Sequence, residues 1–132
     1  MKYAICILFF AFTVSLSAQV NTQKLPLKHF ITMHDSANSI DVVFMLGKGG
    51  SLSIDGKNVQ LFNSFFENIA AERTELPQAG TMMWQINGRE FISGNFYLGE
   101  KTGYIVFTKD AKQYVNQIND QGNTFLKNQI KK

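Results

Sequence analysis

An Asn87–Gly88 pair is the feature that most constrains the fold of this chain. The pair stands between two runs rich in apolar and aromatic residues, 81–86 and 89–98. Both residues adopt positive φ readily, which a two-residue hairpin turn requires. The sequence therefore predicts an antiparallel hairpin built from these two runs.

The two-residue turn also fixes the register of this hairpin. It predicts that Ile86 lies opposite Arg89 and that Trp84 lies opposite Phe91. A glycine-containing turn then leads into a third strand over 104–108. The second half of the chain is therefore predicted to contain a three-stranded meander.

The first half of the chain is predicted to add strands and one short helix. Pro26 suits the start of an edge strand, and alternating β-branched residues indicate strands over 40–46 and 51–54. An Asp-Gly pair then predicts a tight turn followed by a short return strand over 57–61. Apolar residues at helical spacing predict a central helix over 64–73.

The last part of the chain is predicted to be helical. Asp110 is a suitable N-cap, and the apolar residues after it follow the spacing of an amphipathic helix. Gly122 is expected to end that helix, and a last short helix is expected over 125–130. The whole pattern predicts an α+β domain, in which an antiparallel sheet of about five to six strands is packed by one short central helix and by C-terminal helices.

Residues 1–18 have the pattern of a cleavable secretory signal peptide. Lys2 is followed by an apolar run that is too short for a membrane-spanning helix, which needs about 20 apolar residues. Small residues then precede a polar stretch, which predicts cleavage near Ser17 or Ala18. We therefore expect a secreted or periplasmic protein with no transmembrane segment after cleavage.

The remaining chain is expected to consist of a flexible segment, 19–24, and a single globular domain, 25–132. The single cysteine, Cys6, lies in the predicted signal peptide, so the mature protein would contain neither a disulfide nor a cysteine-based site. Without Lys2, 12 basic and 10 acidic residues remain. This weak positive charge and the expected export argue against nucleic-acid binding.

The sequence predicts no catalytic residue, no metal site and no cofactor. His29 and His34 are five residues apart, which would place them on opposite faces of a strand and prevent them from sharing a metal ion. His34, Asp35 and Ser36 are the residue types of a hydrolase triad, but such triads assemble from distant segments. An enzyme with an unrecognised site stays an alternative, and it requires a pocket that brings a histidine next to distant acidic residues.

The meander is predicted to carry apolar side chains on both of its faces. The predicted register places Trp84, Ile86, Phe91, Tyr97, Ile105 and Phe107 on one face, and Met83, Ile92, Phe96, Leu98, Tyr104 and Val106 on the other. A sheet with one face in water would alternate polar and apolar residues, and large exposed apolar patches mark interaction sites. We therefore predict a non-catalytic binding module that docks a protein or small ligand through the aromatic residues of the first face. The partner and the oligomeric state stay open.

Two stretches of the chain resemble a known family. One comprises 40–44 and 51–61, and the other comprises 92–97 and 107–109. They resemble the membrane-bound or periplasmic inhibitors of C-type lysozyme, an eight-stranded barrel family in which a Ser-Gly-x-x-Tyr segment and a later Lys-Gly enter the cleft of the enzyme. The resemblance implies that Ser93 and Lys109 are the inhibitory residues of a lysozyme inhibitor. An inhibitor of a secreted hydrolase, either lysozyme or a protease, therefore stays an alternative, with Asn87–Gly88 or Ser93 in the cleft of the enzyme. The chain lacks the family's cysteines, and Asp110 replaces the glycine after Lys109.

Overall fold

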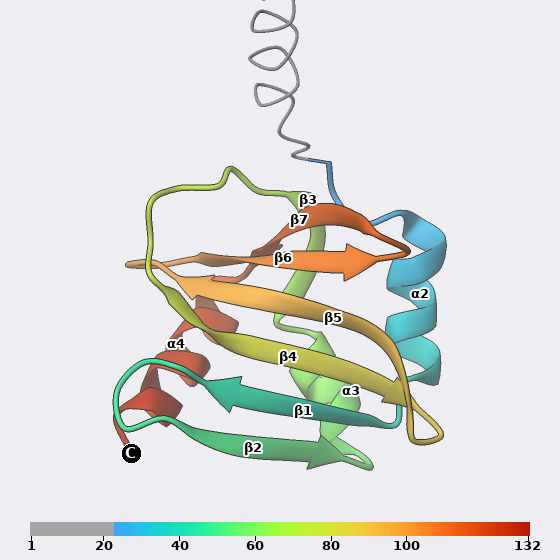
Figure 1. Cartoon of the computed structure of the whole chain (residues 1–132), viewed down its shortest axis with the longest axis horizontal. Coiled ribbons are helices and arrows are strands. Elements are labelled where there is room, and N and C mark those ends of the chain that lie inside the picture. Colours follow the sequence, from blue (N-terminus) through green and yellow to red (C-terminus); the bar gives the residue numbers. More distant parts are fainter. Residues whose placement is uncertain (1–22) are drawn as a thin grey trace, which may run out of the picture.

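The structure is a computed structural model that describes residues 23–132 (Figure 1). The predicted signal peptide, 1–18, and residues 19–22 of the predicted flexible segment lie outside the described residues. Among residues 23–132, no helix is both long and apolar enough to span a membrane.

The described part of the chain forms one antiparallel sheet of seven strands together with three helices, which confirms the α+β class with slightly more strands than expected. In chain order the elements are α2 (Leu27–Ser36), β1 (Ser39–Phe44), β2 (Gly50–Asp55), α3 (Asn58–Asn63), β3 (Phe66–Ala70), β4 (Gln78–Ile86), β5 (Arg89–Leu98), β6 (Gly103–Lys109), β7 (Lys112–Ile118) and α4 (Asp120–Ile130). The strands lie in the order β2-β1-β4-β5-β6-β7-β3. The predicted meander is β4, β5 and β6, and it continues into β7.

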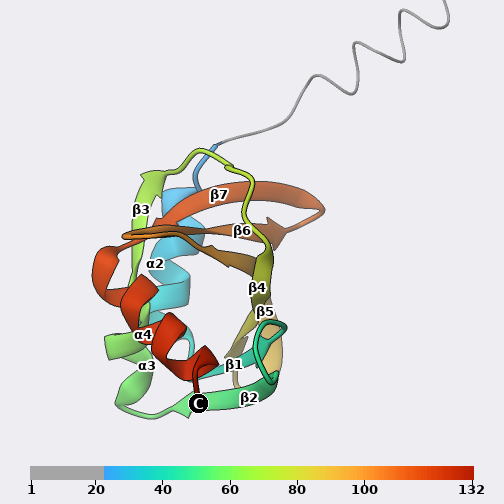
Figure 2. The same ribbon diagram turned by 90° about the vertical axis from the view of Figure 1, so that its left-hand side faces the viewer.

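The sheet curls so that the three helices lie on its concave side (Figure 2). β2 is the edge strand at one end of the sheet, and β3 is the edge strand at the other. Most of the buried apolar residues belong to one cluster, to which the sheet and the helices both contribute. The main core therefore lies between the sheet and the helices.

A β-bulge in the β4–β5 hairpin decides which side chains enter this core. Ile86 lies opposite Arg89, as predicted, but Trp84 lies opposite Ile92. Phe91 is thus an extra residue of β5, and a one-residue shift moves the later side chains of a strand to the other face. The predicted pairing of Trp84 with Phe91 is wrong for this reason.

The bulge gathers the bulky apolar side chains of the meander on one face. The buried residues of this inner face are Met82, Trp84, Ile92, Phe96, Ile105 and Phe107. The outer face of β4 and β5 carries Met83 together with polar residues such as Ser93 and Asn95. The predicted faces are therefore only partly correct, since Ile92 and Phe96 join Trp84 and not Met83.

The outer face of β6 and β7 is covered by residues 71–77, which we call the strap. Tyr104, Val106 and Val115 form a small buried cluster there, against which Ala71, Leu76 and Tyr97 pack. The Tyr104 hydroxyl donates a hydrogen bond to the Thr74 carbonyl oxygen at 2.6 Å, which ties the strap to the sheet. The apolar residues on the outer face are thus partly buried by the chain itself.

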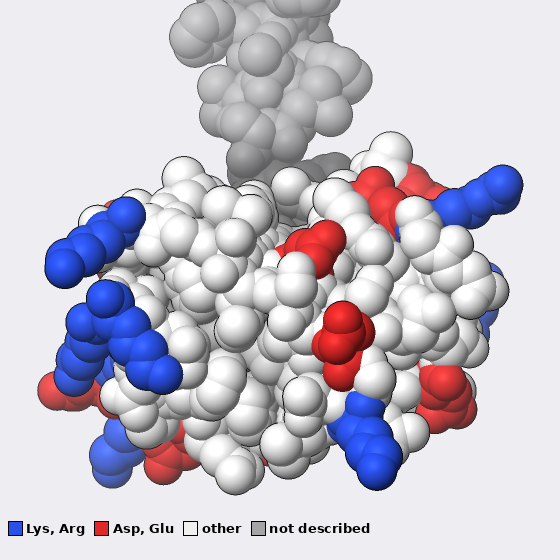
Figure 3. Space-filling view, turned by 90° about the horizontal axis from the view of Figure 1, so that it is seen from below, with Lys and Arg blue, Asp and Glu red and all other residues white. Residues whose placement is uncertain are grey.

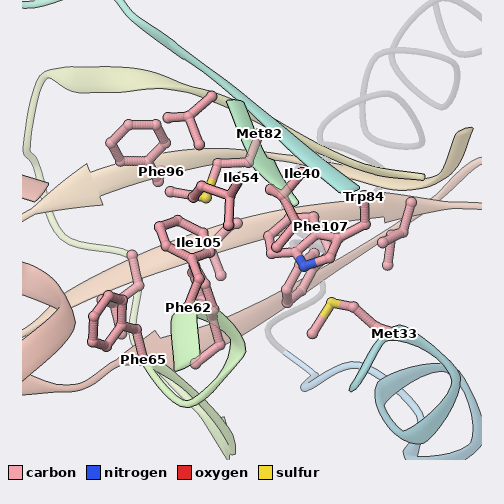
Figure 4. Packing of buried hydrophobic residues seen from close by; sticks show 14 of the residues in the cluster. Met33, Ile40, Ile54, Phe62, Phe65, Met82, Trp84, Phe96, Ile105 and Phe107 are labelled. Atoms are coloured by element: carbon pink, nitrogen blue, oxygen red, sulfur yellow. The ribbon is translucent and has the colours of Figure 1, made fainter. Parts of the chain in front are cut away.

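Trp84 connects the sheet to two helices through a buried hydrogen-bond chain. Its Nε1 donates to Asn63 Oδ1 of α3 at 2.7 Å, and Asn63 Nδ2 donates to the Met33 carbonyl oxygen of α2 at 3.3 Å. The Trp84 ring also packs against Phe66 and Phe107, with ring centroids 5.3 and 5.5 Å away. Figure 4 shows Trp84 beside Phe107 in the core.

Three elements of the first half differ from the prediction. The helix α2 replaces the edge strand, and Pro26 is its N-cap residue. The helix α3 replaces the return strand over 57–61, and β3 replaces much of the helix over 64–73. β3 forms because pairing with β7 and the burial of Phe66 outweigh a local preference for helix.

The prediction of a helix that begins at Asp110 is also wrong, because Asp110 and Ala111 form a hairpin turn between β6 and β7. Their φ angles are 51° and 63°, and the sequence lacks the glycine that usually marks such a turn. Gly122 lies inside α4, where a Cβ would come within 2.5 Å of the Phe65 Cβ, so it permits close packing and does not end the helix. The helix predicted over 125–130 is the last part of α4.

Replacing Ala111 with glycine is expected to stabilise the protein by about 0.5–1 kcal/mol. Glycine adopts positive φ without the steric cost that alanine carries, and this gain exceeds the additional entropy that glycine loses on folding. Urea unfolding measures the change. Ala111→Val is the control and is expected to destabilise the protein, because a β-branched residue is strained at a φ of 63°. Equal stability of the two variants would contradict this turn.

Replacing Asn63 with alanine is expected to destabilise the protein by about 2–3 kcal/mol, because the buried indole N–H of Trp84 loses its acceptor. Urea unfolding of Asn63→Ala, Trp84→Phe and the double variant separates the hydrogen bond from the loss of volume. In the Trp84→Phe background the effect of Asn63→Ala is expected to be smaller. If the loss of stability in the double variant equals the sum of the losses in the two single variants, the hydrogen bond contributes nothing.

Candidate functional site

Trp84 is a core residue, with 0% of its surface exposed. The prediction that it belongs to a docking surface is therefore wrong. The physical reason is that the three helices cover the inner face of the sheet and that Asn63 of α3 accepts its one polar hydrogen. Its side chain stabilises the fold and has no surface left for a partner.

The other predicted aromatic and apolar residues do not form one surface. Phe91 is half-buried and lies under Lys109, whose Nζ is 4.1 Å from the ring centroid and donates to the Phe91 carbonyl oxygen at 2.7 Å. Ile86 is the last residue of β4, beside the hairpin turn. Tyr97 lies near the other end of β5, stacked on Tyr104 with ring centroids 4.7 Å apart.

The lysozyme-inhibitor resemblance implies a fold that this chain does not have. An eight-stranded barrel has no edges, whereas the described sheet ends in β2 and β3 and holds helices on its concave side. Ser93 lies opposite Thr108 on neighbouring strands. The amine of Lys109, the second implied residue, is bound to the Phe91 carbonyl oxygen.

The two histidines lie on α2 and contact aromatic rings. The His29 ring centroid is 6.2 Å from that of Phe91, and the His34 ring centroid is 4.4 Å from that of Phe30. Burial lowers the pKa of His34 from its usual 6.5, and the nearby Asp35 carboxylate partly opposes this effect. Neither histidine lines the two hollows described next, and residues 23–132 contain no group of three or more metal-binding side chains.

The candidate site is a hollow of about 300 Å³ between β2, α3 and α4, which we call the apolar groove. Its lining residues are Leu52, Ser53, Ile54, Asp55, Asn58, Leu61, Phe62, Phe65 and Phe125. Its volume is at the lower end of the range for ligand pockets, and an apolar lining with a few polar groups is typical of them. Figure 3 views the side of the molecule on which β2 and α3 lie, and uncharged side chains form much of it.

Three phenylalanines line the groove on its inner side. The ring centroids of Phe62 and Phe65 are 5.6 Å apart, and that of Phe125 lies 5.3 Å from Phe65 and 6.2 Å from Phe62. Leu61 also lines the groove, and 62% of its surface is exposed. Phe62 and Phe65 are themselves buried, whereas Phe125 is half-buried. Leu61 and Phe125 therefore leave apolar surface that a bound segment can cover.

One wall of the groove is the edge strand β2. It pairs with β1 without interruption from Gly50 to Asp55, and no strand of residues 23–132 pairs with its other side. β2 contains neither proline nor lysine, the residues that commonly protect an edge strand from further pairing. The opposite edge differs, because β3 has five residues and an irregular register with β7.

A second hollow, of about 440 Å³, lies between the strap and the β5–β6 turn. Glu72, Thr74, Glu100 and Thr102 supply much of its polar lining. Burial and the neighbouring Tyr97 raise the pKa of Tyr104, which also lines this hollow, while Arg73 opposes the shift. The lining offers no apolar anchor comparable to the three phenylalanines, so the apolar groove is the stronger candidate.

Searches of protein-family models, curated proteins and solved structures find no match to this chain. The assignment of the site therefore depends on its geometry. Sequence reasoning missed the groove because it assigned Leu61 to a strand and Phe65 to a helix. One signal was available: the run 59–69 contains more large apolar residues than one side of a short element can bury.

Lowering the pH is expected to destabilise the protein through His34. Its pKa is lower in the folded state, so its stabilising effect is complete above the usual value of 6.5 and is lost as the pH falls from 6.5 through the folded value. Thermal unfolding of the wild type and of His34→Leu between about pH 7 and about pH 5 tests this. The wild type should lose more stability than the variant, while His29→Leu serves as the control. Parallel pH profiles of wild type and His34→Leu would exclude this role.

Proposed function

We propose that the protein is a non-catalytic binding module that acts outside the cytoplasm and takes up an extended segment of a partner protein as an added strand on β2. The apolar side chains of that segment occupy the apolar groove. The observation that carries the proposal is that an open sheet edge and an apolar hollow share one strand, β2. The extracytoplasmic location is inferred from the signal-peptide pattern of residues 1–18.

The backbone of β2 supplies the first half of the interaction. In strand addition, main-chain hydrogen bonds provide affinity and pockets for alternate side chains provide specificity. β2 has six residues and an uninterrupted register, which is a typical length for a strand. It therefore offers a regular row of donors and acceptors about 20 Å long.

The side chains beside β2 supply the second half. Ile54 is buried and Leu52 is half-buried on the inner face, whereas Ser51 and Ser53 are exposed on the outer face. A strand added next to β2 continues this alternation, because successive side chains point to opposite faces. The matching segment is therefore apolar at every second residue, on the side that faces Leu61.

This proposal keeps the predicted class of function and moves its location. The apolar residues that a partner would contact are Leu61 and Phe125, which lie over the buried Phe62 and Phe65, in place of Trp84 and its predicted neighbours. A small apolar molecule fits the volume of the groove but makes no use of the open edge. Strand addition uses both features, which is why we favour it.

A synthetic peptide that is as long as β2 and alternates valine with threonine is the probe for this proposal. Fluorescence anisotropy of the labelled peptide is expected to show binding to the wild type and at least tenfold weaker binding to Leu61→Asp, because a carboxylate at the groove disfavours apolar contact. Ile69→Asp is the matched control, since Ile69 is similarly exposed at 52% on β3, the opposite edge.

Two methylated versions of the peptide separate strand addition from simple hydrophobic capture. N-methylation of the alternate amides that face β2 removes the hydrogen bonds of the added strand, whereas N-methylation of the other amides does not. Only one of the two versions is expected to lose binding. Equal binding of both, or equal effects of Leu61→Asp and Ile69→Asp, would disprove strand addition at β2.

A further inference from the structure

Three lysines lie near the beginning of β2, at one end of the open strand edge. Lys48 lies in the turn between β1 and β2, and Lys131 and Lys132 follow α4 directly. The turn packs against the end of α4, because a Cβ on Gly47 would come within 2.9 Å of the Ile130 side chain and carbonyl oxygen. All three lysines are exposed, and basic side chains gather on the left of Figure 3, the side on which this turn and the C-terminus lie in Figure 1.

The other end of β2 has no such excess of charge. Asp55 ends the strand and Lys57 follows it closely, so that one acidic and one basic side chain stand near each other. Both are exposed. The β2 edge therefore has a positive end and an end whose two charges balance.

We propose that the segment taken up by β2 runs antiparallel to it and carries acidic residues at its carboxyl end. This inference rests on the proposed function and specifies the chemistry of the partner. An antiparallel segment begins near Asp55 and ends near Lys48, so its last residues meet the three lysines. The partner is thus an extended apolar segment with an acidic carboxyl-terminal flank.

The antiparallel direction follows from the ladder that the added strand joins. Every pair of strands in the described sheet is antiparallel. Antiparallel hydrogen bonds are perpendicular to the strands, and this pairing is slightly more stable per residue than parallel pairing. An acidic flank at the amino end of an antiparallel segment would instead lie beside Asp55, where it gains little.

The charges adjust affinity and direction, while the apolar contacts provide the main attraction. Exposed ion pairs contribute little individually, and three lysines together are expected to strengthen binding about tenfold at low salt. Salt screens exposed charges, so this advantage should shrink as ionic strength rises. Complementary charge also favours the correct approach of the partner and excludes segments with a basic flank.

Three versions of the alternating valine–threonine peptide test the inference: one with glutamates at the carboxyl end, one with glutamates at the amino end, and one without. Their anisotropy titrations use the wild type, Lys131→Glu/Lys132→Glu, and the control Lys28→Glu/Lys112→Glu, whose side chains are exposed and do not line the groove. The carboxyl-acidic peptide is expected to bind about tenfold more tightly than the neutral one. This advantage should disappear in Lys131→Glu/Lys132→Glu and persist in the control.

Each contrary result has a separate meaning. Equal affinity of the three peptides overturns the inference and leaves strand addition intact, whereas tighter binding of the amino-acidic peptide overturns the antiparallel direction. The proposed function is overturned as well if the neutral peptide does not bind and the acidic peptides bind Leu61→Asp as tightly as the wild type. A further test measures whether the protein sediments with vesicles of anionic phospholipid. If sedimentation requires Lys131 and Lys132 but not Leu61, these lysines bind a membrane surface instead.

Discussion

One extra residue in β5 determines how the whole sheet meets its helices. Without the bulge at Phe91, Ile92 and Phe96 would face outward while Trp84 faced inward, and neither face could be continuous. With it, Trp84, Ile92 and Phe96 all lie on the concave side. The hydrogen bonds from Trp84 to Asn63 and from Asn63 to Met33 then hold α3 and α2 against the apolar residues of this face.

The same arrangement leaves β2 open. Because α2, α3 and α4 all pack on the concave side, none of the helices within residues 23–132 covers the edge strand from outside, and α3 and α4 complete a groove beneath it. The outer cluster around Tyr104, by contrast, is closed by the strap. Exposed apolar side chains also occur elsewhere, on α2, on β3 and on the outer face of β1 and β4, but only Leu61 among them lines the apolar groove beside an open strand edge.

The parts of the fold that depend on local signals could be predicted from the sequence, and those that depend on distant contacts could not. The Asn87–Gly88 turn sets its hairpin, and the α+β class follows from alternating strand patterns combined with apolar residues at helical spacing. The bulge at Phe91 has no local signature, since only packing against the helices requires it. The turn at Asp110 and Ala111 lacks the expected glycine. The groove was not predicted because β2, α3 and α4 meet there from separate parts of the chain, and because Leu61 lies on a helix where a strand was expected.

The difference between the two sheet edges limits how many strands can be added to the sheet by pairing. An assembly that grows by strand pairing needs two regular edges on every subunit, as fibrils have. Here β2 is regular and accessible, whereas β3 is short and loses its register against β7. Under the proposed strand addition, pairing through β2 would therefore end after one addition and give a closed complex instead of a polymer.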